Sequence, residues 1–145
     1  MIFEVVATLC AGLFAGAAIY ITFVEHPARL ECGTELAATE FGPSYRRATL
    51  MQASLAAVGL LSALVAWLQG GEPAVLIGGL LLGAVIPFTL LVILPTNKRL
   101  LDPTLDRNSA EAAVLLVRWG RLHAVRSAMS GGAFLVLLWY LGVSG

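Results

Sequence analysis

The chain has 145 residues, of which 59% are hydrophobic and only 12% are charged, and its mean hydropathy is +0.87. Soluble domains carry about 25% charged residues, so this composition predicts an integral membrane protein. Nine basic and nine acidic residues give a net charge of zero, which argues against nucleic acid as a partner.

Four apolar stretches are long enough to cross about 30 Å of hydrocarbon as helices. They cover residues 5–24, 48–68, 74–94 and 125–143. We interpret the first as a retained span and not as a signal peptide, because no basic residue precedes it. The sequence therefore predicts one domain, an all-α up-and-down bundle of four transmembrane helices in a lipid bilayer.

The first connection begins with Pro27, directly after Glu25 and His26. Proline has no backbone N–H, so the first helix is expected to stop or kink here. Residues 30–44 are polar, and Gly42-Pro43 interrupts them. This pattern predicts a short interfacial helix in the first loop.

The third span contains Pro87, which leaves the carbonyl of Gly83 without its helical partner and predicts a mild kink. The capping sequence Asn108-Ser109-Ala110-Glu111 predicts that the last helix begins near residue 110. If Gly120 is tolerated, this helix reaches residue 143, is about 50 Å long, and projects beyond the membrane over its first third.

All basic residues lie in the first and third connections or at the adjoining span edges. They are Arg29, Arg46, Arg47, Lys98, Arg99, Arg107, Arg118, Arg121 and Arg126. The positive-inside rule places both connections in the cytoplasm and the termini outside. We expect a protein of a bacterial inner membrane. Gly12 and Gly16 allow close helix packing, and a homo-oligomer is compatible with that pattern.

A polar and aromatic face marks the start of the last span. At 100° per residue, Trp119, His123 and Arg126 fall within a stripe about 60° wide. Ionisable side chains in a membrane segment are costly unless they are paired or face an aqueous cavity, so such a face indicates a functional site.

Other polar residues are expected to meet this face. Spans one and three end on the side where spans two and four begin, which brings His26, Tyr45 and Asn97 to one mouth of the bundle. Arg29 and Glu25 border the same break. Together these groups predict a small-molecule pocket at one membrane interface, in which the polar groups satisfy one another.

Three roles are open for the residues of this pocket. A histidine near Arg126 could act as a general base, with the resulting anion stabilised by the guanidinium and the Asn97 amide. Two histidines and Glu25 could instead bind a metal, although no HxxxH or HExxH spacing occurs. The groups could also serve only to hold the helices in register.

The order of these motifs resembles the anthrone oxygenase-like membrane family. The likeness consists of a His-Pro break after the first span, a Pro-x-Asn break after the third, and Trp-x-x-x-His-x-x-Arg before the fourth. The matching residues are His26, Pro27, Pro95, Asn97, Trp119, His123 and Arg126.

The resemblance implies oxidation of anthrones to anthraquinones by O₂ with no cofactor. The methylene proton of an anthrone is acidic because its carbanion is aromatised, so a histidine base could form an anion that reacts with O₂ directly. We therefore expect a cofactor-independent oxygenase of anthrone-like or other lipophilic phenolic molecules. Its catalytic residues would be His26, His123, Arg126 and Asn97, its substrate-binding residues Trp119, Tyr45, Arg29 and Glu25, and it would hold no metal. The alternatives are a non-catalytic lipid-binding, small-molecule-binding or assembly protein, and a metal-dependent oxidoreductase.

Overall fold

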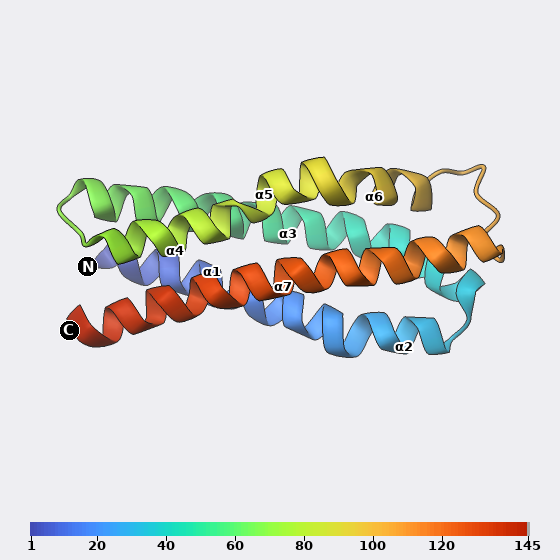
Figure 1. Cartoon of the computed structure of the whole chain (residues 1–145), viewed down its shortest axis with the longest axis horizontal. Helices are drawn as coiled ribbons and strands as arrows, with labels where there is room; N and C mark the ends of the chain where they lie inside the picture. Colours follow the sequence, from blue (N-terminus) through green and yellow to red (C-terminus); the bar gives the residue numbers. More distant parts are fainter. Residues whose placement is uncertain (145) are drawn as a thin grey trace.

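The computed structural model describes residues 1–144, which form four long antiparallel rods (Figure 1). Two of the rods contain π-helical turns, labelled η. The elements in chain order are α1 (Ile2–Tyr20), η1 (Ile21–Glu25), α2 (His26–Glu31), α3 (Thr34–Leu68), α4 (Pro73–Gly83), α5 (Val85–Phe88), η2 (Thr89–Ile93), α6 (Leu94–Leu100) and α7 (Ala110–Ser144). No strand occurs among these residues.

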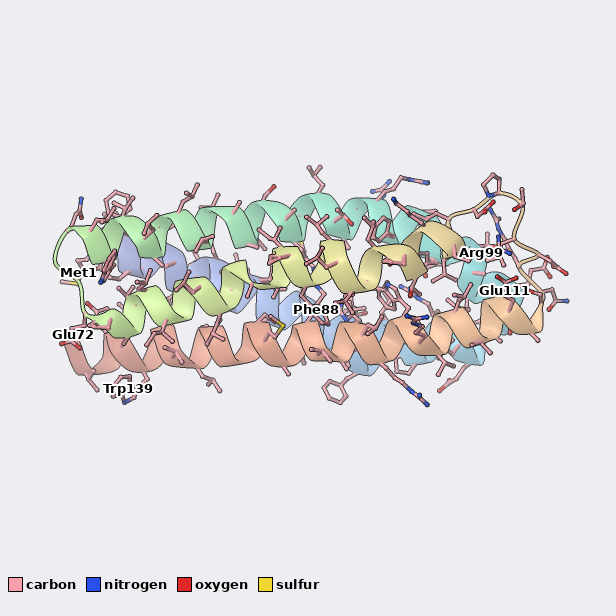
Figure 2. The ribbon with its side chains drawn as sticks, turned by 45° about the horizontal axis from the view of Figure 1, so that its top comes forward. Met1, Glu72, Phe88, Arg99, Glu111 and Trp139 are labelled. Atoms are coloured by element: carbon pink, nitrogen blue, oxygen red, sulfur yellow. The ribbon has the colours of Figure 1, made fainter. Side chains whose placement is uncertain are left out.

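The predicted four-helix architecture is confirmed. Four continuous helical stretches are long and apolar enough to cross a membrane, and they cover Ile2–Glu31, Thr34–Leu68, Pro73–Leu100 and Ala110–Val143. Both chain ends lie at one end of the bundle, and the first and third connections lie at the other (Figure 1). In Figure 2, Met1 and Glu72 mark the first of these ends, and Arg99 and Glu111 mark the second. The protein is therefore an integral membrane protein.

Small residues hold the helices together in the half of the bundle nearest the termini. Ala7, Ala11 and Ala63 are fully buried there. A methyl group on Gly78 would come within 2.5 Å of the Leu137 side chain, so α4 approaches α7 as closely as glycine permits. The half that contains the first and third connections has a separate core of larger residues, including Phe41.

The first helix does not stop at Pro27. It continues to Glu31 through η1, where the backbone N–H of His26 donates to the carbonyl of Ile21, five residues back. A π-turn of this kind absorbs the irregularity that the missing proline N–H creates. The same arrangement precedes Pro95, where the N–H of Leu94 donates to the carbonyl of Thr89.

The prediction of a separate interfacial helix in the first loop is wrong. Only Cys32 and Gly33 separate α2 from α3, and α3 then runs unbroken through Pro43 to Leu68. Ala37 and Phe41 are both fully buried, so tertiary packing keeps this part of α3 helical despite the proline.

The predictions for the last two spans are confirmed in part. The third span breaks at Ala84, between α4 and α5 and three residues before Pro87. Helix α7 begins at Ala110, where the Ser109 hydroxyl accepts a 3.1 Å hydrogen bond from the N–H of Ala112, and it continues through Gly120. The first third of α7 packs on the bundle, since Ala112 and Leu116 are fully buried.

Two polar residues tie the third connection together. Asp102 accepts hydrogen bonds from the Thr104 hydroxyl and backbone N–H, at 2.7 and 2.8 Å. These bonds, with the nearby charge of Arg99, lower the pKa of the Asp102 carboxyl below its ordinary value. Arg99 also donates to both carboxylate oxygens of Glu111, which joins α6 to the first turn of α7 (Figure 2).

Candidate functional site

Trp119 is the centre of an aromatic and cationic stack built from three elements. Its ring stacks on His123 of α7, with ring centroids 4.7 Å apart and planes inclined by 25°. His26 of α2 lies on the indole at 5.0 Å, and Phe41 of α3 meets it edge-on at 5.3 Å. The Arg29 guanidinium lies 5.7 Å from the ring centroid. Trp119 thus fixes the relative positions of both histidines.

The hydrogen bonds around His123 favour a proton on its Nδ1 atom. The Ser127 hydroxyl lies 3.0 Å from the Ala18 carbonyl and 3.2 Å from the His123 carbonyl, and it can only donate to them. Ser127 Oγ therefore accepts from the Thr22 hydroxyl, at 2.8 Å. With its hydrogen used, Thr22 Oγ1 accepts the proton of His123 Nδ1, at 3.1 Å.

This chain of bonds has a chemical consequence for His123. With Nδ1 protonated, the Nε2 lone pair of the neutral ring is available, and no group in residues 1–144 bonds to it. The side chain is only 2% exposed, so bulk water is largely excluded from the ring. A neutral imidazole in this state can accept a proton at Nε2.

Arg126 follows His123 by three residues on α7 and carries a positive charge. One of its terminal nitrogens donates to Gln52 Oε1 at 2.8 Å, and its guanidinium lies 5.4 Å from the Phe14 ring centroid. Neither Arg126 Nε nor Gln52 Nε2 has a hydrogen-bond partner in the described residues, and neither atom is reached by solvent. Since an unpaired buried donor costs free energy, both groups are suited to bind an oxygen of a ligand.

A small polar cavity contains these groups. It has a volume of about 20 Å³, enough for roughly one water molecule. Of the predicted site residues it brings together five on its walls: Arg29, Tyr45, Trp119, His123 and Arg126. An imidazole, guanidinium groups and aromatic rings therefore line one space.

A network of charged residues borders the cavity through Arg29 and Ser44. Arg29 is only 7% exposed and pairs with Glu25, and its Nε lies 2.8 Å from a carboxylate oxygen of Glu40. The Ser44 hydroxyl donates to the same Glu25 oxygen at 2.7 Å and lies 3.2 Å from Arg29. These contacts clamp α2 to the beginning of α3.

Three predicted site residues lie outside the cavity walls. His26 sits behind Trp119, where a methyl group on Gly120 would come within 2.6 Å of its Nε2 atom, and its Nδ1 has no partner in the described residues. Asn97 is 1% exposed on α6, and neither side-chain polar atom forms a hydrogen bond within residues 1–144. Glu25 does not line the cavity itself but pairs with Arg29, which does.

Sequence reasoning missed Gln52, Thr22 and Ser127. All three belong to helices that are long and apolar enough to span a membrane, and a polar side chain there is a usable signal because an uncompensated polar group in a membrane is costly. Thr22 and Ser127 were hidden by their size, since small hydroxyls often bond to their own helix.

The described residues contain no cluster of three or more His, Cys, Asp or Glu side chains placed to hold a metal ion. Trp119 lies against both histidine rings, and the carboxylate of Glu25 is occupied by Arg29 and Ser44. A metal at this site would have to draw on other ligands.

A family model described as anthrone oxygenase matches residues 41–136, about two thirds of the chain. The match includes Tyr45, Asn97 and the Trp119, His123 and Arg126 face, and it begins after the first helix. Neither a curated protein nor a solved structure matches the chain.

Proposed function

Because the chain belongs to the anthrone oxygenase family, we propose that it is a membrane-embedded, cofactor-independent oxygenase of anthrone-like or other lipophilic phenolic molecules. The observation that carries the proposal is the pairing of His123 and Arg126 in one secluded cavity. His123 presents an unbonded Nε2, and Arg126, which lines the same cavity, has a buried N–H without a partner in the described residues.

The reaction follows from these two groups. His123 Nε2 removes a proton from the activated methylene carbon of the substrate. The negative charge moves onto the carbonyl oxygen of the substrate, where the Arg126 guanidinium and the Gln52 amide stabilise it. The electron-rich carbanion adds O₂, and the resulting peroxide is protonated by the imidazolium. Loss of water then converts the methylene into a carbonyl. One O₂ is consumed, with one oxygen atom in the product and one in water.

The aromatic residues hold the substrate in this proposal. Tyr45 provides a flat wall for a planar molecule, and Phe41 stacks on Tyr45 with ring centroids 5.7 Å apart. Trp119 stacks on His123 and holds the base in place. Arg29 completes the polar wall. In this proposal His26 supports the ring of Trp119, and Asn97 does not contact the substrate.

We place the protein in a bacterial inner membrane with the cavity toward the cytoplasm. The support for this orientation is the concentration of all nine basic residues at the end of the bundle that holds the first and third connections. A lipophilic substrate would reach the cavity without leaving the bilayer.

The test is O₂ consumption by purified protein in detergent with anthrone as substrate, measured against empty micelles. Wild-type protein should exceed the background, and His123→Gln should lower the excess about 10²–10⁴-fold, the usual contribution of a general base. Arg121→Gln is the matched control, because Arg121 is exposed on the same helix, and it should retain full activity. Anthraquinone formed should equal O₂ consumed.

A rate equal to that of empty micelles would defeat the oxygenase proposal. The second candidate, a non-catalytic protein that binds a lipid or small molecule, would then be favoured, because the unpaired Arg126 and Gln52 donors fit a bound oxygen whether or not it reacts. If activity persists in His123→Gln, a residue other than His123 is the base.

A further inference from the structure

A second, larger cavity adjoins the polar one. It has a volume of about 120 Å³ and lies between α3 and the α5–η2 segment. Its walls are mainly apolar, with Phe14, Ala56, Val85 and Leu90 among them. We refer to it as the apolar chamber. Tyr45, Thr49, Gln52 and Arg126 line both cavities, so the two spaces share one boundary.

The apolar chamber exists because close helix packing ends at Ala84. Up to that point α4 lies tightly on α3, where a methyl group on Gly83 would come within 2.7 Å of the Leu60 side chain. The break associated with Pro87 then offsets the rest of the third span, which Figure 1 shows as a step between α4 and α5. Beyond the step, α3 and α5–η2 separate and leave the space between them.

The chamber opens toward lipid and not toward water. Its rim residues Ala53 and Leu90 are exposed, and both belong to apolar membrane-spanning stretches. Leu91 beside them is 78% exposed, which is the expected environment of a lipid-facing side chain. Phe88, two residues before Leu90, lies about midway along the bundle (Figure 2).

The polar cavity alone is too small for a ring system. Its 20 Å³ holds about one water molecule. A wider groove beside Ala17 and Met51, with a volume of about 510 Å³, also adjoins the polar cavity, but neither Arg126 nor Gln52 lines it. The apolar chamber combines room for a hydrophobic body with both of these side chains in its wall.

We propose that the apolar chamber is the substrate's route and binding site: a planar apolar molecule enters from the bilayer between Ala53 and Leu90. Its rings occupy the chamber, its oxygen accepts hydrogen bonds from Arg126 and Gln52, and its reactive carbon reaches His123 across the shared boundary. The ligand class is a fused aromatic ketone or phenol. This inference rests on the proposed function for the reaction, but binding in the chamber is separable from it.

The test places larger side chains at Ala53, on the rim, to reduce the width of the chamber's opening. Trp67 and Trp139 are exposed, so replacing both with Phe leaves Trp119 as the fluorescent reporter beside the site. In lipid nanodiscs, the unreactive probe anthraquinone should quench Trp119. Ala53→Leu and Ala53→Phe should raise the apparent Kd progressively, by at least tenfold for Phe. The matched control is Ala57→Phe, which is exposed one turn further along α3 and does not line the chamber, and it should stay within twofold.

The outcomes separate this inference from the oxygenase proposal. If Ala53→Leu and Ala53→Phe both fold and bind anthraquinone as tightly as the Trp119-only parent does, the lateral route is wrong, even where anthrone oxidation is intact. If the substitutions weaken binding while wild-type protein consumes no O₂ with anthrone, the result supports the chamber as the binding site and contradicts the oxygenase proposal. The graded Leu variant keeps the test decisive if the Phe variant does not fold.

Discussion

His123 and Thr22 are 101 residues apart in the sequence, yet a 3.1 Å contact joins His123 Nδ1 to Thr22 Oγ1. Thr22 in turn contacts Ser127, which bonds to the backbone of α1 and α7. The relay places the imidazole of α7 against the π-turn η1. It also favours the tautomer that the proposed mechanism requires.

We expect Thr22→Val to impair the base without removing it. Valine matches threonine in shape but leaves the Nδ1 proton without its acceptor, which costs about 1–3 kcal/mol, and kcat should fall roughly 5- to 150-fold. The KM for anthrone should change little, because Thr22 does not line either cavity. Thr22→Ser restores the hydroxyl and should recover most of the activity. Equal kcat values for the Val and Ser variants would separate the relay from the reaction.

The hydrogen bond between Arg126 and Gln52 should appear as a coupling energy. The sequence predicted that Arg126 would be satisfied by groups such as His26 and Asn97, but the structure gives it Gln52 at 2.8 Å. A double-mutant cycle with Arg126→Met and Gln52→Leu, read by unfolding in detergent, should show about 0.5–3 kcal/mol of non-additivity. The same cycle with exposed Arg121 in place of Arg126 should be additive within about 0.5 kcal/mol.

Gly120 should tolerate no side chain, because His26 occupies the space in front of it. A methyl group there would meet His26 Nε2 at 2.6 Å, so Gly120→Ala must displace the ring and its contact with Trp119. Such overpacking costs about 1–3 kcal/mol, which thermal unfolding would detect.

Gly131 on the same helix provides the control for this substitution. A methyl group on Gly131 would meet no atom within 4 Å, so Gly131→Ala should be neutral or stabilise α7 by up to about 1 kcal/mol. If the two alanine variants unfold at the same temperature, His26 does not depend on Gly120 for its position.

The fold was predictable because it depends on features that are local in sequence. Apolar length identifies the four spans, and the turn around Gly70 and Gly71 forces the second and third to be antiparallel. Periodicity also worked within α7, where Trp119 and His123 share the cavity face over an uninterrupted helix. These inferences need no knowledge of how the helices pack.

The rest of the site depends on register changes that sequence does not reveal. Each π-turn adds one residue, which rotates the following segment by about 100° relative to a regular helix. Pro27 and Pro95 indicate that an irregularity is present, but they do not distinguish a break from a π-turn. The directions in which Glu25, His26 and Asn97 face therefore could not be derived from the sequence. That Gln52 is the partner of Arg126 depends on how the helices pack, which the sequence does not show.

The last prediction concerns the orientation of the bundle in the membrane. Cys32 is exposed at the end that holds the basic residues, whereas Cys10 is buried within the first span. The positive-inside rule places Cys32 in the cytoplasm, so an impermeant maleimide should label wild-type protein only after the cells are permeabilised. Glu72→Cys with Cys32→Ser moves the thiol to an exposed position at the opposite end, where intact cells should be labelled. Labelling of wild-type Cys32 in intact cells would mean that the basic residues reflect the binding site and not the orientation.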